Sequence, residues 1–359
     1  MNCLAILVNY HCADLILEAV ASIAADPECD WIHVVDNSED AAEAALLKDK
    51  LPTKVRLIVS PRNIGFGRAC NLALEGMQPD AVLLLNPDAT LRPGALGQLK
   101  ATLLAHKSAG AVGPRVYWDE DENFLMPPST YPSSVGFFVE LLGRRWPWVE
   151  RLRAAHFRNT SLTYWTCEQP VRVAALSGGH VLLRHKALLS ANGLFDPRFF
   201  MYWEDTDLMR RLTDKHWQLW MEPRARAVHA YAHSDAKDRM LVAGWDVYQD
   251  RYFSHFFWQW LMNFCVGAST PNAADFKRIQ PNADSDVWID MPERRNCAWL
   301  MEISPSQKFV PSIGLFGHGT RGVISGHLTA RLTGRDYYVR VQNLKSPTQS
   351  TRLYKFCSE

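Results

Sequence analysis

The apolar positions in the first third of the chain form short continuous runs that alternate with segments of helical spacing. Continuous apolar runs of this length are typical of strands that are buried on both faces of a sheet. The predicted strands are residues 3–10, 31–38, 55–61 and 81–89. Their alternation with helical segments predicts an α/β fold, with a mostly parallel sheet that is flanked by helices.

The middle of the chain is less regular. Residues 115–170 are rich in proline and aromatic residues, and we expect a long excursion over the functional site. Order returns at 171–188, where a strand and a glycine turn are followed by another strand or a helix start. A helix is predicted to begin near Asp205, and the aromatic segment 246–267 is predicted to be helical.

Turn-forming residues dominate 267–286 and indicate a linker, beyond which short alternating runs predict a small antiparallel β-sandwich. The predicted strands there are 287–291, 298–304, 312–317, 322–332 and 336–344. The expected domain organisation is 1–245, 246–284 and 285–359. Aromatic residues of these last strands could stack on sugars, but a structural or oligomeric role is favoured because such residues more often belong to a core. They are Trp288, Trp299, Tyr337 and Tyr338.

Composition describes an ordinary globular protein of 359 residues, with 47% hydrophobic and 21% charged residues. The net charge of +1 gives no electrostatic reason to bind nucleic acid. Eight scattered cysteines without a CxxC pair favour reduced thiols in a cytoplasmic protein. The first residues are interpreted as a strand and not a signal peptide, and no apolar run reaches the roughly 18 residues of a membrane span. Residues 252–264 are expected to be a buried interdomain helix, with contact at a membrane surface as the alternative.

Polar residues follow three of the predicted parallel strands, at the edge of the sheet where ligands bind in such folds. They are Asp36-Asn37-Ser38, Arg62-Asn63 and Asn86-Pro87-Asp88. Asp88 could hold a divalent metal on a diphosphate, although Asn-Pro-Asp is also ordinary turn chemistry. Asp36 could accept from a nucleobase imide, although this segment could equally cap the next helix.

Residues 60–71 carry two glycines, Gly65 and Gly67, and then Arg68, directly before a predicted helix. The pattern is neither GxGxxG nor GxxxxGK. The glycines could let the helix amino terminus approach an anion, with Arg68 in the first turn. A plain strand-to-helix connection is the alternative.

The segment FFMYWEDTDLMRR, residues 199–211, sets three carboxylates against an aromatic run. Acidic residues in a first helical turn are favoured by the helix dipole, which is one explanation. The other is that the aromatic wall desolvates a carboxylate and makes it an effective general base. Further along, His229 and His233 lie near a strand end, and His229 could complete a metal site with Asp88.

Six motifs in order resemble the inverting family 2 glycosyltransferases, in particular the bacterial rhamnosyltransferase and galactofuranosyltransferase branch that builds cell-surface polysaccharides such as O-antigen. The motifs are VDNS, RNIGFGRACN, LLLNPDA, SGGHVLLR, GLFDPRFFMYWEDTDLMRRL and AVHAYAHS. The resemblance covers about residues 3–235 and leaves 236–359 uncovered. It implies a GT-A fold, a nucleotide-diphosphate sugar donor and a divalent cation, Mn²⁺ or Mg²⁺.

The resemblance also implies roles for individual residues. Asp205 would be the catalytic base, with Glu204 as its neighbour, and Asp207 would orient or cap. The metal ligands would be Asp88 and His229, although Asn86 replaces the first acid of the family's DxD motif. The acceptor or sugar would lie against Gly178, Gly179, Tyr202 and Trp203. The donor nucleotide would be bound by Val8, Asn9, Asp36, Asn63, Gly65, Arg68, Asn86 and Asp88.

The implied reaction moves rhamnose or another hexose from a dTDP- or UDP-sugar to a hydroxyl of a cell-surface glycan or a lipid-linked oligosaccharide. Asp205 removes the hydroxyl proton, the configuration inverts, and the aromatic run 199–203 forms a platform for a sugar ring. A non-catalytic carbohydrate-binding scaffold and a nucleotidyltransferase are the alternatives. Peripheral contact with the inner face of the membrane and homo-oligomerisation are left open, as are the identities of the donor and acceptor.

Overall fold

The computed structural model describes residues 1–230, 235–265, 276–279, 285–291, 297–332, 336–344 and 351–356. Nine strands in this part form one mixed sheet in the order β3-β2-β1-β4-β8-β6-β9-β5, with β7 paired to β9. The strands are β1 (Cys3–Asn9), β2 (Trp31–Asp36), β3 (Val55–Val59), β4 (Ala81–Leu85), β5 (Ala89–Leu91), β6 (Ala109–Tyr117), β7 (Val171–Val173), β8 (His180–Arg184) and β9 (Gln218–His229). The predicted α/β fold class is confirmed.

The first four strands are parallel to one another, because β1 pairs with both β2 and β4, and β2 pairs with β3. Every side chain of β1 and β4 is buried, as their continuous apolar runs predict. The sheet then changes direction, since β8 is antiparallel to both β4 and β6. The carboxyl ends of β1, β2, β3 and β4 therefore meet at one edge.

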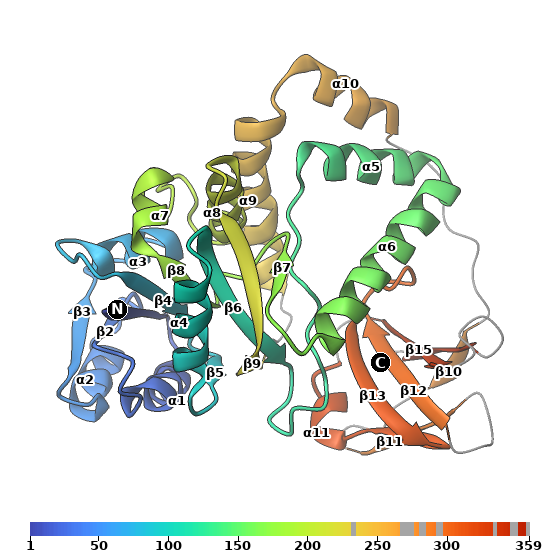
Figure 1. Cartoon of the computed structure of the whole chain (residues 1–359), viewed down its shortest axis with the longest axis horizontal. Helices are drawn as coiled ribbons and strands as arrows, with labels where there is room; N and C mark the ends of the chain where they lie inside the picture. Colours follow the sequence, from blue (N-terminus) through green and yellow to red (C-terminus); the bar gives the residue numbers. More distant parts are fainter. Residues whose placement is uncertain are drawn as a thin grey trace.

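Helices cover both faces of this sheet and create two separate apolar cores (Figure 1). One core contains side chains of α1 and α4, and the other contains side chains of α3, α7 and α8. The helices that cover the sheet or flank β2 are α1 (Ala13–Ala24), α2 (Ala41–Lys50), α3 (Phe66–Leu74), α4 (Ala95–Ala105), α7 (His185–Ser190) and α8 (Glu204–Asp214). The predicted helix start near Asp205 is one residue from the observed start.

The expectation of an irregular excursion at 115–170 is wrong, because this segment contains two helices, α5 (Ser134–Arg145) and α6 (Pro147–Thr166). The prolines that suggested a loop mark a helix start: Pro147 occupies the first turn of α6, where no hydrogen bond is lost. Figure 1 shows both helices extending away from the parallel strands. α6 instead reaches the C-terminal strands, where Arg158 Nε donates to Glu302 Oε2 at 3.1 Å.

An aromatic core joins α5 to α9 (Asp235–Phe253) and α10 (Phe256–Cys265). The helical prediction for 246–267 is confirmed for 246–253 and 256–265, with a break at 254–255, and the last two residues lie outside the described part. Phe137 of α5, Tyr248 and Phe253 of α9, and Leu261 of α10 are among its buried members. No helix in the described ranges is long and apolar enough to cross a bilayer.

The C-terminal strands form two sheets over a shared apolar core. One has the order β10-β16-β15-β12-β13, and the other is the pair β11-β14. Their elements are β10 (Lys277–Ile279), β11 (Val287–Asp290), β12 (Cys297–Ser304), β13 (Ile313–Gly319), β14 (Arg321–Ile324), α11 (Gly326–Thr329), β15 (Tyr337–Asn343) and β16 (Thr351–Phe356). Strands β10 and β16 were not predicted, and they pair in parallel in an otherwise antiparallel sheet. The predicted strand 322–332 is wrong in its second half, which contains α11. Most of the predicted linker 267–286 lies outside the described residues.

Candidate active site

The carboxyl ends of β1, β2 and β3 carry a hydrogen-bonded polar cluster. Asp36 is 1% exposed, and its Oδ1 accepts from Asn9 Nδ2 at 3.0 Å and from the Ser38 amide at 3.2 Å. Asn9 Nδ2 also donates to Glu43 Oε2 of α2 at 2.7 Å. Glu43 was not among the predicted site residues, because only its position in the first turn of α2 brings it back to the strand ends. Val8, another predicted donor contact, is 6% exposed in β1.

The end of β3 is tied to this cluster through side-chain amides. Asn37 Nδ2 donates to Asn63 Oδ1 at 2.8 Å, and the Ile64 amide donates back to Asn37 Oδ1 at 3.0 Å. Asn63 Oδ1 also accepts from the Gly65 amide at 3.0 Å. Two of the three predicted polar strand ends are therefore in direct contact, and Asn63 shapes the turn that leads into α3.

The turn before α3 is shaped by protein contacts. Gly65 has a φ of +82°, and a Cβ there would lie 2.3 Å from the Phe200 carbonyl oxygen. The Phe66 amide donates to that same oxygen at 2.9 Å, so the first N–H group of α3 is already used. The glycine is thus explained by the close approach of the Phe200 backbone, without a phosphate.

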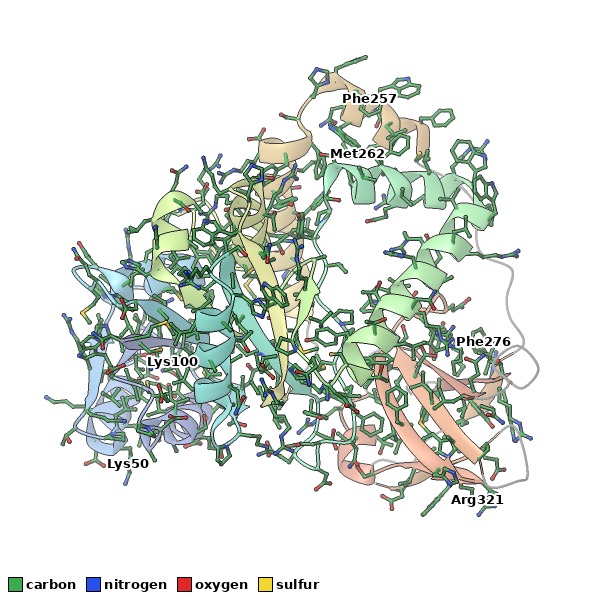
Figure 2. The ribbon with its side chains drawn as sticks, in the orientation of Figure 1. Lys50, Lys100, Phe257, Met262, Phe276 and Arg321 are labelled. Carbon is green, nitrogen blue, oxygen red and sulfur yellow. The ribbon has the colours of Figure 1, made fainter. Side chains whose placement is uncertain are left out.

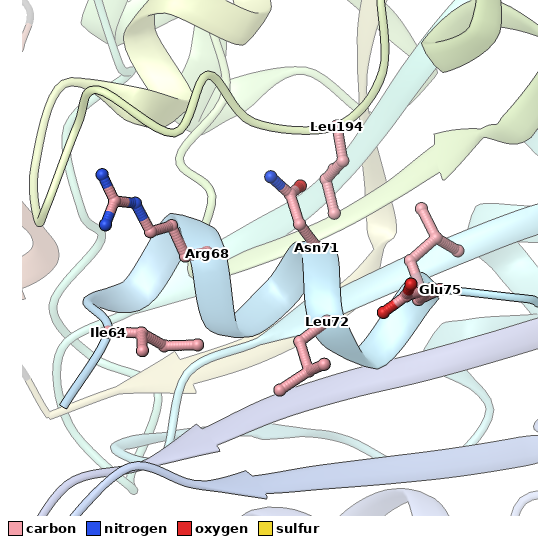
Figure 3. Close-up of a pocket in the computed structure, with 7 residues that line it drawn as sticks. Ile64, Arg68, Asn71, Leu72, Glu75 and Leu194 are labelled. Atoms are coloured by element: carbon pink, nitrogen blue, oxygen red, sulfur yellow. The ribbon is translucent and has the colours of Figure 1, made fainter. Parts of the chain in front are cut away.

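Arg68 lies on the outer side of α3, where its Nε donates to the Pro197 carbonyl at 2.8 Å. It lines a hollow of about 490 Å³ on this side of the helix, together with Asn71, Glu75 and Leu194 (Figure 3). Neither Asp36 nor Asp88 lines that hollow. Contact between Arg68 and a diphosphate stays a prediction, because its guanidinium is engaged by the loop that precedes α8.

The third polar strand end places Asp88 next to His229. Asp88 Oδ1 and His229 Nε2 are 3.1 Å apart, and β5 pairs with β9 so that Ala89 faces His229. The Asp88 side chain is 24% exposed and the His229 side chain is 10% exposed. His233 lies outside the described residues.

Cys12 lies near both the Asp36–Glu43 cluster and Asp88. Burial raises the pKa of its thiol, and the carboxylates of Glu43, Asp88 and Asp36 raise it further. Cys12 follows the carboxyl end of β1, and the charges of Asp36 and Asp88 both act on its thiol, so the two carboxylates lie near the same edge of the sheet.

A buried histidine that sequence reasoning missed lies behind this edge. The His180 ring is edge-on to the His229 ring, with 5.4 Å between their centroids. Burial, followed by the nearby His229, lowers the pKa of His180 to about 3, so this ring is neutral. Its place is fixed by the pairing of His180 with Leu85 across β8 and β4, a contact that only the register reveals.

Gly178 and Gly179 join this edge to α8. The Gly178 amide donates to Asp205 Oδ2 at 2.9 Å, and a Cβ on Gly178 would lie 2.8 Å from the Asp205 Cβ. A Cβ on Gly179 would lie 2.7 Å from Asn86 Nδ2, and the Gly179 carbonyl accepts from the Asn86 amide at 2.8 Å. The two glycines thus make room for Asp205 and Asn86, whereas the sequence predicted that they make room for a sugar.

The acidic segment of α8 sends its three carboxylates in different directions. Asp205 is partly exposed, and its Oδ1 accepts from the Thr206 amide at 2.6 Å. Glu204 is 5% exposed, and its Oε2 has no hydrogen-bond partner in the described structure. Burial, followed by the charge of Asp205, raises the pKa of Glu204 to about 8. The desolvation predicted for this pair therefore falls on Glu204, which favours its neutral form.

Asp207 is fully buried and links α8 to α9. Its Oδ2 accepts from Arg211 Nε at 2.7 Å, and its Oδ1 accepts from the Tyr252 hydroxyl at 2.7 Å. Arg251 forms an ion pair with the same oxygen at 3.0 Å. Asp207 thus ties α8 to α9, and its expected role in orienting the site stays a prediction.

The aromatic run before α8 is used mainly for packing. Phe199 is fully buried, which rules it out as part of a sugar platform. The Trp203 ring packs against Trp245 and Tyr248 of α9, at 4.9 and 5.2 Å, and its Nε1 donates to the Leu241 carbonyl. Tyr202 and Trp203 both have positive φ values, 66° and 69°, in the turn that enters α8. Contacts of Tyr202 and Trp203 with a sugar stay predictions.

The strand-helix sheet, with its polar edge at the parallel strand ends, agrees with the GT-A fold that the sequence resemblance implies. Residues 5–173 match the family model described as glycosyl transferase family 2. This match covers just under half of the chain.

Two curated relatives, from Mycobacterium tuberculosis strains CDC 1551 / Oshkosh and ATCC 25618 / H37Rv, are N-acetylglucosaminyl-diphospho-decaprenol L-rhamnosyltransferases. Each is 32% identical over 199 residues, covering 51% of this chain and 61% of the relative. The chain thus matches about three fifths of the length of these relatives.

Solved structures resemble the chain more distantly. A structure of GalNAc-T7 with UDP, GalNAc and Mn²⁺ has a TM-score of 0.48 and 14% identity, over 72% of this chain and 50% of that one. Glucosyl-3-phosphoglycerate synthase from Mycobacterium tuberculosis has a TM-score of 0.46 and 16% identity, over 70% of this chain and 80% of that one. Likeness at this level carries over neither a substrate nor a metal.

Proposed function

We propose that this protein is an inverting glycosyltransferase that moves a sugar from a nucleotide-diphosphate donor to an acceptor hydroxyl. The observation that carries the proposal is the contact of Gly178 with Asp205 and of Gly179 with Asn86. These adjacent glycines place a partly exposed carboxylate beside the edge that carries Asp88 and His229. A base beside a diphosphate-binding edge is what glycosyl transfer requires.

The names of the curated relatives support a finer assignment. Both transfer L-rhamnose to an N-acetylglucosaminyl-diphospho-decaprenol. By analogy, the donor of this protein is a dTDP- or UDP-linked hexose such as rhamnose, and its acceptor is a polyprenyl-diphosphate-linked sugar or a growing glycan. The nucleoside would lie over β1 and β2, where the Asp36 carboxylate can accept from an imide.

The residues at the edge fit a divalent cation. Asp88 and His229 offer one carboxylate and one imidazole within 3.1 Å of each other, and Asn86 adds an amide oxygen nearby. The described residues contain no group of three or more His, Cys, Asp or Glu side chains that could hold a metal alone. The donor diphosphate would therefore supply the remaining oxygens. When bound, Mn²⁺ or Mg²⁺ would neutralise charge on the leaving diphosphate.

In the reaction, Asp205 removes the proton from the acceptor hydroxyl as that oxygen attacks the anomeric carbon. The carbon–oxygen bond to the diphosphate breaks on the opposite side, so the configuration inverts. The Gly178 amide holds Asp205 Oδ2, and the Thr206 amide holds Oδ1, which fixes the orientation of the carboxylate before the acceptor arrives. Glu204 is buried behind Asp205 and takes no direct part.

The test is a donor screen with UDP-, dTDP- and GDP-sugars, with and without Mn²⁺, in which released nucleoside diphosphate is measured. Asp205→Asn should lower turnover about 10²- to 10⁴-fold with donor binding nearly unchanged. Asp214→Asn is the matched control, because Asp214 is exposed at the other end of α8. Asp88→Ala should weaken donor binding and its metal dependence, with the exposed Asp121→Ala as control.

Near wild-type turnover in Asp205→Asn would refute the assignment of the base. Release of pyrophosphate from a nucleoside triphosphate that is supplied together with a sugar 1-phosphate would indicate nucleotidyl transfer instead. Absence of binding for every donor would favour the non-catalytic scaffold, for which Asn86 in place of an acid is the supporting feature.

A further inference from the structure

The outer face of α10 is aromatic and exposed, although its inner face is already buried. Leu261 and Cys265 point into the aromatic core with α5 and α9, and Met262 packs beside them between α10 and α5 (Figure 2). On the other side, the exposed fractions are 78% for Phe256, 43% for Phe257, 52% for Trp260 and 48% for Phe264. Gln259 and Asn263 are the polar residues of this helix, and both are exposed together with the four aromatic side chains.

This exposed face continues onto the junction of α5 and α6. The Trp260 and Phe264 rings stack at 5.5 Å, and the Phe264 and Trp146 rings are 6.5 Å apart. Trp146 is 38% exposed and Trp148 is 62% exposed. We name Phe256, Phe257, Trp260, Phe264, Trp146 and Trp148 the aromatic ridge. Contiguous exposed apolar surface of this kind marks a binding surface, in contrast to single exposed residues.

Arginines border the ridge, and the two acidic residues near it are already paired with other arginines. Arg145 and Arg151 are exposed, and neither has an ion-pair partner among the described residues. Arg144 pairs with Glu140 at 2.9 Å, and Glu150 is buried against Arg153 at 2.8 Å. Helix α10 itself contains no charged residue. The local charge is thus positive although the chain as a whole is nearly neutral.

We propose that the aromatic ridge docks this protein on an anionic membrane surface. Tryptophan and phenylalanine rings enter the interface between lipid headgroups and acyl chains, and the arginines beside them attract acidic headgroups. A second copy of the chain fits less well, because a two-fold contact through the ridge would bring unpaired arginines together with no acid to receive them. Docking would bring the protein to its acceptor only if the acceptor is lipid-linked, as the proposed function holds. Binding of the ridge to a membrane does not depend on that function.

The ridge is coupled to the base-bearing helix by a short path. α10 begins at Phe256, directly after α9 ends at Phe253, and Tyr252 of α9 donates to the buried Asp207 of α8. Docking through α10 would therefore set the orientation of Asp205 relative to the membrane. A sugar carried on a polyprenyl diphosphate lies at that surface, where the diphosphate holds it in the headgroup region.

The test is sedimentation of the full-length protein with vesicles of phosphatidylcholine, or of equal parts of phosphatidylcholine and phosphatidylglycerol, without donor or acceptor. We expect binding to the anionic vesicles that weakens with salt. Arg145→Gln and Arg151→Gln should each weaken it about fivefold. Phe257→Ser with Trp260→Ser should weaken it roughly tenfold or more. Arg56→Gln and Trp288→Ser, exposed elsewhere on the molecule, are the matched controls.

Equal binding of ridge and control variants, or no binding to anionic vesicles, would overturn the proposal. Sedimentation velocity distinguishes the alternative, since a dimer that the ridge variants dissociate would assign the ridge to a second copy. Circular dichroism checks that each variant is folded. Release of nucleoside diphosphate from a donor in detergent should be unchanged in these variants, so a failed docking proposal and a failed transferase proposal give different results.

Discussion

Glu204, the neighbour of the proposed base Asp205, makes the stability of the fold depend on pH. It is a carboxyl group with a buried oxygen that lacks a partner, and it is next to a second carboxylate. Its pKa rises from 4.5 to about 8 on folding, so between these values the folded state holds a proton that the unfolded state has lost. The free energy of unfolding must therefore fall as pH rises through this window.

We expect Glu204→Gln to remove most of this pH dependence. The variant keeps the shape of the neutral acid, so it should match the wild type near pH 5 and melt at a higher temperature near pH 8. Thermal unfolding at several pH values measures this. The exposed Glu168→Gln serves as control. A parallel pH dependence in wild type and Glu204→Gln would show that Glu204 is ionised in the folded protein.

Gly178 gives a second prediction at the scale of single residues. A methyl group there would overlap the Asp205 side chain, with 2.8 Å between the two Cβ atoms, and would move this proposed base. Gly178→Ala should lower kcat about 10²-fold with little effect on the KM of the donor. Gly97→Ala in α4 is the control, because its Cβ would meet only ordinary contacts. Steady-state kinetics would contradict the prediction if only the donor KM changed.

At the scale of elements, the sequence predicted best those features that follow from a single physical rule. The buried parallel strands follow from apolar runs, and the polar edge follows from the rule that such strands end together. α5 and α6 were missed because Pro147 stands where it can begin a helix as well as break one. The pairing of Asp88 with His229 was suggested by the chemistry of the two side chains and supported by a resemblance, since the β5–β9 register that creates it is not visible in the spacing.

The contact between α8 and α9 gives a prediction for these elements. Asp207→Ala would leave Arg211 and Arg251 without their shared carboxylate, and should lower the free energy of unfolding by roughly 3 kcal/mol. Tyr252→Phe removes one hydrogen bond to Asp207 and should cost about 1 kcal/mol. Urea unfolding measures both, with Tyr10→Phe on the exposed surface as control. If neither variant lowered the free energy of unfolding, α8 would be held by apolar packing alone.

At the scale of the whole molecule, one buried carboxylate joins α6 to the C-terminal sheet. Glu302 is fully buried in β12, and it accepts from Arg340 at 2.7 and 2.6 Å and from Arg158 of α6 at 3.1 Å. The glutamate could not be predicted as a structural residue, because its partners come from distant parts of the chain. Its position in β12 gives no sign that its carboxylate meets two arginines.

Glu302→Ala should therefore weaken the attachment of α6 to these strands. We expect a loss of roughly 3 kcal/mol, because two arginines would remain beside an apolar core without their acid. Limited proteolysis should cut within α6 faster than in the wild type, whereas Asp290→Ala, at an exposed ion pair, should behave like the wild type. Unchanged proteolysis would show that α6 is anchored by Trp165 and its apolar neighbours instead.

The ladder between β5 and β9 has an evolutionary consequence. Asp88 and His229 are 141 positions apart in the chain, yet their separation in space is set by a few backbone hydrogen bonds at one sheet edge. The intervening chain can lengthen or be replaced without disturbing that pair, provided that both strands still meet. Helices α5 and α6, which arise from this interval, are then a region where insertions can accumulate, and a lineage could change where its enzyme docks while its chemistry stays the same.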